Sequence, residues 1–97
     1  MARTRITARA AREALDDLVT ALETRHRQIG EGFWSDPLRQ IEEYRMARRC
    51  RVAAETALAG RDRGRTRTVV ECVAMGFRNL RDRTAEAALW GVLYDEG

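Results

Sequence analysis

The sequence predicts an all-α fold: a three-helix, or four-helix, antiparallel bundle, or a helical hairpin crossed by a third helix. Apolar residues recur at spacings of three and four along three segments, which is the period of a helix with one buried side. Residues typical of helix starts and ends separate these segments. The expected helices span about 6–29, 37–59 and 67–94, with a break near 81–84 as an open alternative. We expect a single domain over 1–97, because so short a chain has no room for two.

The first predicted helix has an apolar stripe opposite a charged side. The stripe comprises Ala8, Ala11, Leu15, Leu18, Leu22 and Ile29. We expect Leu18 and Leu22 to lie in the core. A hydroxyl of Thr4 or Thr7 can cap the start, by accepting a hydrogen bond from a free amide of the first turn. Gly30 and Gly32 mark the end, since glycine most easily adopts the backbone found just after helices.

The second predicted helix begins at the sequence Ser-Asp-Pro, residues 35–37. Asp36 is expected as the N-cap, and Pro37 suits the first helical position, where its missing N–H leaves no hydrogen bond unmade. Phe33 and Trp34 precede the cap, and we expect them to pack back on the new helix as a hydrophobic staple.

Apolar residues occupy two sides of this second helix, which should end at Gly60. Leu38, Ile41 and Tyr44 lie on one side, and Met46, Cys50, Ala53, Ala57 and Leu58 lie nearly opposite. Either the helix touches two different neighbours or it bends. A small protein with one core normally needs only one apolar side. The second side is therefore a candidate interface.

The last segment follows an arginine-rich linker over residues 60–68. Its apolar residues are Val69, Val70, Val73, Phe77 and Leu80. Their spacing favours a helix, although the valines leave a strand as the alternative. The apolar stripe shifts from Ala85 onward, so that Asp82 or Thr84 could cap a separate fourth helix. A single kinked helix fits equally well.

Composition narrows the class of protein. The chain is 44% hydrophobic and 34% charged, and it has neither an apolar run that could span a membrane nor the pattern of a secretory signal. Two cysteines form no disulfide framework, so we expect a cytoplasmic protein with reduced thiols. All 18 basic residues are arginine, which indicates a GC-rich genome more than a nucleic-acid binder. We expect a protein from a bacterium, a phage or a mobile element.

Candidate catalytic and metal-binding residues are few. His26 is the only histidine, and its position three residues after Glu23 matches half of a di-iron motif, but the remaining ligands are missing. Cys50 and Cys72 lack the close spacing of zinc or redox sites. No nucleophile or nucleotide-binding motif occurs. We therefore expect a non-enzymatic protein without metal or cofactor.

The arginines suggest two candidate binding sites. The first, for a protein partner, combines arginines with aromatic residues on the second helix: Trp34, Tyr44, Arg45, Arg48 and Arg49. The second, for the phosphates of a nucleic acid, is a basic pole formed by the linker: Arg61, Arg63, Arg65 and Arg67. We expect a small regulator or inhibitor that binds a larger protein, with a nucleic-acid-binding accessory protein as the alternative. A homodimer and a monomer fit the sequence equally well.

Overall fold

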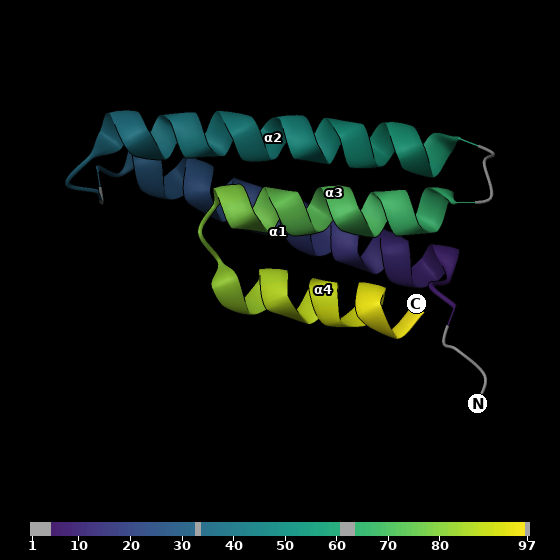
Figure 1. The fold of residues 1–97 in the computed structure, drawn as a ribbon. Coiled ribbons are helices and arrows are strands. Elements are labelled where there is room, and N and C mark those ends of the chain that lie inside the picture. Colours follow the sequence, from purple (N-terminus) through teal and green to yellow (C-terminus); the bar gives the residue numbers. More distant parts are fainter. Residues whose placement is uncertain (1–4, 33, 61–63, 97) are drawn as a thin grey trace.

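The computed structural model describes residues 5–32, 34–60 and 64–96, and the regular structure in these residues is entirely helical. The four helices are α1 (Ala8–Gly30), α2 (Pro37–Ala59), α3 (Arg65–Asn79) and α4 (Arg83–Glu96) (Figure 1). The all-α prediction is confirmed, and the valine-rich segment is a helix rather than a strand. No helix in the described part of the chain has the length and apolar character needed to cross a membrane.

Polar side chains cap the starts of α1 and α2 where the sequence predicts them. The Thr7 hydroxyl accepts a hydrogen bond from the Ala10 amide at 3.0 Å, and Thr4, the other candidate, lies outside the described residues. The Asp36 carboxylate accepts a hydrogen bond from the Arg39 amide at 3.2 Å. Each cap satisfies an amide that has no partner within its own helix.

The chain reverses between α3 and α4 through a left-handed residue, Arg81, whose φ is 60°. The Arg81 amide donates to the Arg78 carbonyl and the Asp82 amide to the Phe77 carbonyl, both at 3.0 Å, which is the pattern of a Schellman motif. Glycine is preferred at this position, but the Arg81 guanidinium here binds Glu43 of α2, with Nε 2.5 Å from Oε2. The segment predicted as 67–94 thus contains two helices, and the Asp82 carboxylate caps the second.

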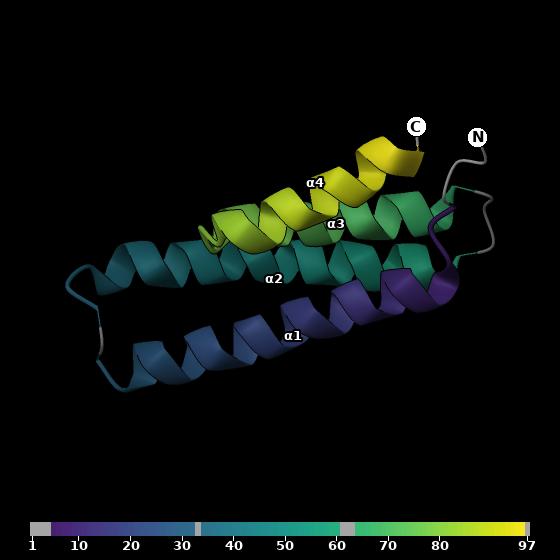
Figure 2. The same cartoon turned by 90° about the horizontal axis from the view of Figure 1, so that it is seen from below.

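Each helix runs antiparallel to the one before it (Figures 1 and 2). The largest helix–helix contact joins α2 and α3, α1 packs against both of them, and α4 packs on α3. α2 and α4 lie on opposite sides of α3 (Figure 1). The first three helices therefore surround the core, and α4 is the outermost member.

The core is built mainly from α1 and α3. The large side chains that are almost fully buried include Leu15, Leu18, Val69, Val70, Val73 and, from α4, Leu93. Leu18 and Leu22 are 0% and 2% exposed, as predicted from the stripe. α1 and α3 approach each other closely at Gly76, where an added Cβ would lie 2.7 Å from Leu18 Cδ2.

α2 touches two neighbours, α1 and α3, which is one of the two arrangements that its two apolar sides left open. Its buried residues are Gln40, Ala47 and Ala54, spaced by seven, and they lie between the two sides predicted to be apolar. Leu38 is 80% exposed, and Met46 of the other predicted side is also exposed. The alanines let α2 approach both α1 and α3 closely, while Tyr44 and Leu58 pack half-buried against the core and Leu38 and Met46 remain exposed.

Candidate functional site

The outer side of α2 carries an unusual mixture of exposed apolar and basic residues. We define the outer stripe of α2 as Leu38, Arg45, Arg48, Arg49 and Val52. Leu38 and Val52 are 80% and 58% exposed. Positions 38, 45 and 52 are seven residues apart, so they lie nearly in line along the helix. Helix propensity and core packing do not require large apolar residues here, because α2 is buried through its alanines.

Arg45, Arg48 and Arg49 are the central part of the outer stripe. They are exposed, and with Val52 they line a hollow of about 430 Å³. Nine other arginines of the described residues form ion pairs with carboxylates, but these three pair with none of the described carboxylates. Glu42 precedes Arg45 by about one turn. Together, these three arginines and Glu42 have a formal charge of +2.

The two aromatic residues of the predicted partner site lie elsewhere. Tyr44 is half-buried toward α1, and its ring centroid is 5.7 Å from that of His26. Trp34 is half-buried, and the guanidinium carbon of Arg25 lies over its ring, 5.0 Å from the ring centroid. Its indole N–H is buried and has no hydrogen-bond partner among the described residues. Trp34 therefore contacts Arg25 of α1, and Phe33, the other residue of the predicted staple, lies outside the described residues.

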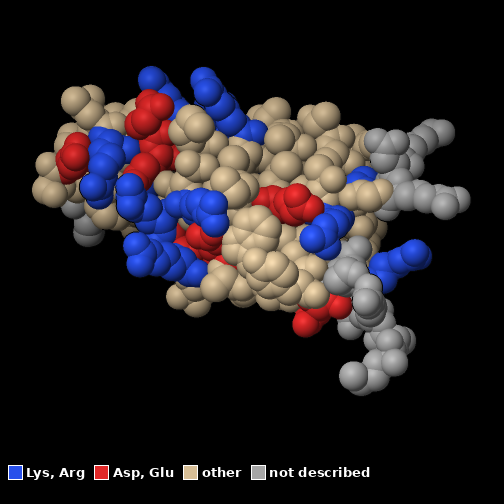
Figure 3. Space-filling model, in the orientation of Figure 1, with Lys and Arg blue, Asp and Glu red and all other residues tan. Residues whose placement is uncertain are grey.

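Arg25 belongs to a polar network that joins three helices. Its Nη1 donates to Gln40 Oε1 at 2.6 Å, and its Nη2 donates to the Leu80 carbonyl at 2.8 Å. Glu43 lies 3.5 Å from Arg25 and also pairs with Arg81. Figure 3 shows basic and acidic side chains intermingled at this end of the molecule, where α3 ends and α4 begins. Mutual pairing of this kind indicates a structural role.

The alternative basic site is only partly described. Arg61 and Arg63 lie outside the described residues. Arg65 Nη1 donates to two carbonyls at the end of α2, those of Leu58 at 3.0 Å and Gly60 at 2.8 Å. These carbonyls have no partner within the helix, and a cation is favourable beside them. Arg65 therefore stabilises the end of α2, and these neutral carbonyls leave its positive charge in place.

Other arginines at the same end of the molecule are also engaged. Arg67 Nε lies 3.1 Å from Glu71 Oε1, and its Nη1 donates to the Leu93 carbonyl at 3.2 Å. Arg9 near the start of α1 pairs with Glu13 at 3.3 Å. The described part of the predicted pole thus offers less free positive charge than the sequence suggests.

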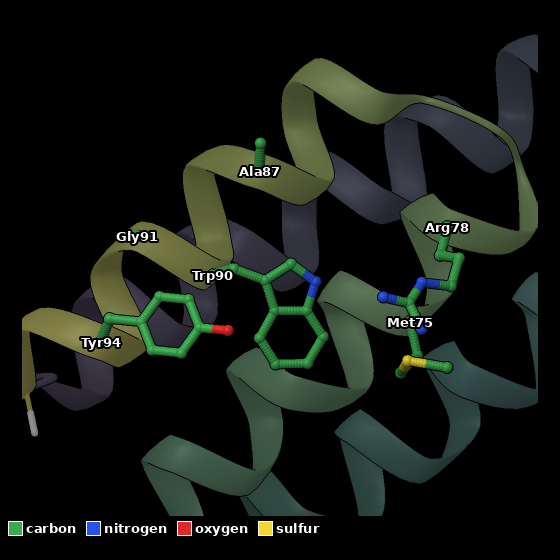
Figure 4. A pocket seen from close by; sticks show the side chains of 6 residues that line it. All are labelled: Met75, Arg78, Ala87, Trp90, Gly91 and Tyr94. Carbon is green, nitrogen blue, oxygen red and sulfur yellow. The ribbon is translucent and has the colours of Figure 1, made fainter.

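A second concave surface, between α3 and α4, was not predicted. This α3–α4 groove has a volume of about 610 Å³ and is lined by Met75, Arg78, Ala87, Trp90, Gly91 and Tyr94 (Figure 4). The Trp90 indole donates to Glu86 Oε2 at 2.8 Å, and Arg78 Nε lies 2.7 Å from the same oxygen. These interactions, the indole hydrogen bond foremost, lower the pKa of Glu86 below its ordinary value. The Arg78 guanidinium also lies 5.9 Å from the Trp90 ring centroid.

The sequence contains a pattern that could have indicated this groove. Trp90 and Tyr94 are four residues apart, as are Ala87 and Gly91, so large and small residues share one side of a helix. Their place beside Met75 of α3 depends on the turn at Arg81, which the sequence leaves open.

The surroundings of the two thiols make them poor nucleophiles. Burial raises the pKa of Cys50, partly offset by a hydrogen bond from Asn79, and burial also raises the pKa of Cys72. Raised pKa values leave both thiols protonated and poorly nucleophilic. No three His, Cys, Asp or Glu side chains within 5–32, 34–60 and 64–96 cluster as metal ligands, and Glu23 and His26 are exposed.

Comparison with known proteins finds no match: no family model, no curated protein and no solved structure is similar to this chain. The function of this chain is therefore inferred from its own side chains and their arrangement.

Proposed function

We propose that the chain is a small non-enzymatic binding protein, a regulator or inhibitor, that docks on a larger protein through the outer stripe of α2. The proposal includes the antiparallel helical bundle predicted from the sequence, in which α2 is buried on one side and offers the other. Arg45, Arg48 and Arg49 keep their predicted role, and Leu38 and Val52 replace the predicted Trp34 and Tyr44 as the apolar part.

The three arginines without a described carboxylate partner carry this proposal. Most other arginines of the described residues pair with carboxylates, so three neighbouring arginines without such a partner concentrate positive charge on this side of α2. Arginine is enriched among the residues that dominate protein interfaces, where its planar fork binds carboxylates in pairs of hydrogen bonds. The complementary partner is an acidic helix or loop with apolar side chains.

Exposed apolar residues favour a protein over a nucleic acid as this partner. Leu38 and Val52 lie at either end of the three arginines. Contacts with the phosphates of a nucleic acid do not require such exposed apolar side chains. In the basic pole of the nucleic-acid alternative, the charge of Arg67 is offset by Glu71, and the guanidinium of Arg65 is held against backbone carbonyls at the end of α2.

A binding experiment with a designed probe tests the proposal. The probe is a fluorescent amphipathic helix of about 20 residues, with leucines on one side and glutamates beside them, compared with a version in which glutamine replaces glutamate. We expect the acidic probe to bind wild type, and Arg45→Glu/Arg48→Glu to weaken binding by at least about tenfold in fluorescence anisotropy.

The matched control is Arg9→Glu/Arg12→Glu, which makes the same change in net charge on exposed positions of α1. We expect it to change affinity for the probe by less than about threefold, since those residues lie in weak surface pairs. Equal loss in both variants would reduce the effect to net charge and contradict a docking site. Tighter binding of a DNA duplex than of the acidic helix would favour the nucleic-acid alternative.

A further inference from the structure

We propose that the partner of the outer stripe is a helix whose side chains form three layers along α2: apolar, then acidic, then apolar again. This inference rests on the proposed function and adds the order in which the partner presents its side chains. Residues seven apart lie nearly in line on a helix, about 10.5 Å from one another. Leu38, Arg45 and Val52 have this spacing, and no other described helix covers this side of α2 (Figure 1).

The middle layer of the outer stripe consists of Arg45, Arg48 and Arg49. All three are exposed, and none pairs with a described carboxylate. Arg49 Nη1 donates to Met46 Sδ at 3.9 Å, and a thioether is only a weak acceptor. A guanidinium binds a carboxylate through two parallel hydrogen bonds. Carboxylates three or four residues apart on a partner helix share one side of it and can face these arginines together.

The layer toward the start of α2 combines apolar side chains with a negative charge. Leu38 is 80% exposed, and Ile41, three residues later, is half-buried. Glu42 is exposed one turn after Leu38, and it has no ion-pair partner in the described part of the chain. A partner carboxylate in this layer would lie near Glu42, and like charges repel each other. This layer therefore favours an apolar side chain of the partner and disfavours an acidic one.

The layer toward the end of α2 is apolar, and its polar groups are engaged within α2 itself. Val52 is 58% exposed. Glu55 pairs with Arg51 at 2.6 Å, and the Thr56 hydroxyl donates to the Val52 carbonyl at 2.9 Å. The hollow of about 430 Å³ lies between Val52 and the three arginines. An apolar side chain of the partner can enter it and contact both Val52 and the aliphatic parts of the arginines.

The attraction for carboxylates is therefore confined to the centre of the outer stripe. With Glu42 in the first layer, the three arginines in the second and the Arg51–Glu55 pair in the third, the formal charges are −1, +3 and 0. A leucine placed over the arginines would bury their donors without acceptors. A carboxylate placed over Leu38 would lose water without gaining a donor. The order of the partner's side chains thus affects affinity even when its composition and net charge are fixed.

Two fluorescent helical peptides of identical composition test this order. The matched peptide has two glutamates at the centre of its binding side and leucines one heptad before and after them. In the shuffled peptide the glutamates occupy the two end layers and leucines occupy the centre. Circular dichroism compares the helix content of the two peptides. In fluorescence anisotropy we expect wild type to bind the matched peptide at least about tenfold more tightly than the shuffled one.

A second variant exchanges two layers of the protein while its composition stays the same. Leu38→Arg/Arg45→Leu moves an arginine into the first layer and a leucine into the middle one, and both positions are exposed. We expect the preference for the matched peptide to fall below about threefold. The control, Arg83→Val/Val92→Arg, exchanges an arginine and an apolar residue at exposed positions of α4 and should keep the wild-type preference.

The outcomes separate the order of the layers from docking itself. Equal binding of the two peptides to wild type would overturn the layered order, whereas weaker binding of both to Arg45→Glu/Arg48→Glu would still support docking through the outer stripe. Tighter binding of the shuffled peptide, or a tenfold preference that persists in Leu38→Arg/Arg45→Leu, would also overturn the layered order. Binding of neither peptide would contradict the proposed function and this inference together.

Discussion

Replacing Gly76 by alanine tests how closely α1 and α3 meet. An added Cβ would lie 2.7 Å and 3.0 Å from the two Cδ atoms of Leu18, whose side chain is fully buried. Carbon atoms in favourable contact are about 3.5–4.0 Å apart. The Leu18 side chain must therefore shift inside a packed core, where neighbouring side chains leave little room.

Two opposing changes in the free energy of unfolding follow from Gly76→Ala. Alanine stabilises a helix by about 1 kcal/mol relative to glycine, whereas overpacking costs about 1–3 kcal/mol. We expect Gly76→Ala to destabilise the protein by up to about 2 kcal/mol. Leu18→Val removes both Cδ atoms, so in that background Gly76→Ala should stabilise by about 1 kcal/mol. The double-mutant cycle then gives a coupling of about 1–3 kcal/mol.

Urea unfolding of the four proteins, followed by circular dichroism at one protein concentration, measures this cycle. A fixed concentration is needed because dimerisation would change the apparent stability. Gly30→Ala serves as the control, since a Cβ there meets nothing within 4 Å. Equal stabilisation by Gly76→Ala in both backgrounds would refute the close approach of α1 to α3.

Three further predictions concern a cap, a turn and a carboxylate. Asp36→Ala should lower the free energy of unfolding by about 1 kcal/mol through loss of the N-cap of α2, and an unchanged urea midpoint would contradict that cap. Arg81→Gly should change the free energy of unfolding by less than about 1 kcal/mol, because the relief of a left-handed φ is offset by the loss of the pair with Glu43, which is 11% exposed and keeps Arg25 as a partner; a larger loss would show that the pair dominates. The lowered pKa of Glu86, due first to the Trp90 indole, means that its stabilisation is present above the unfolded pKa and lost as pH falls through the folded pKa. Glu86→Gln should therefore flatten the fall of the melting temperature on acidification, and an identical pH profile would exclude this contribution.

Local sequence signals predicted most helix starts and ends. Thr7, Asp36 and Asp82 cap helices because their side-chain oxygens accept hydrogen bonds from backbone amides three residues further on. Such caps involve no residue that is distant in the sequence. The burial of Leu18 and Leu22 also follows from spacing within α1.

Features that depend on contacts between helices were not predictable in the same way. The buried side of α2 is set by Ala47 and Ala54, which a search for large apolar residues overlooks. Arg81 takes the left-handed position where a glycine would be expected. Each is decided by packing against another helix, which the spacing within one segment does not encode.

In the candidate site, too, some features follow from the local sequence and others depend on contacts between helices. Arg45, Arg48 and Arg49 share the outer side of α2, as the helical period predicts. Tyr44 instead lies near His26 and Trp34 near Arg25, and both are contacts with α1 that the spacing within one helix does not predict. The α3–α4 groove required the turn at Arg81 to bring two helices together.

The most direct test of docking through α2 is a two-dimensional ¹⁵N–¹H NMR titration of the labelled protein with the acidic amphipathic helix. We predict that the largest amide shifts fall between Arg45 and Val52 and at Leu38, with smaller changes along α4. Shifts centred instead on the start of α3 around Arg65, or an unchanged spectrum at saturating probe, would contradict the proposed function.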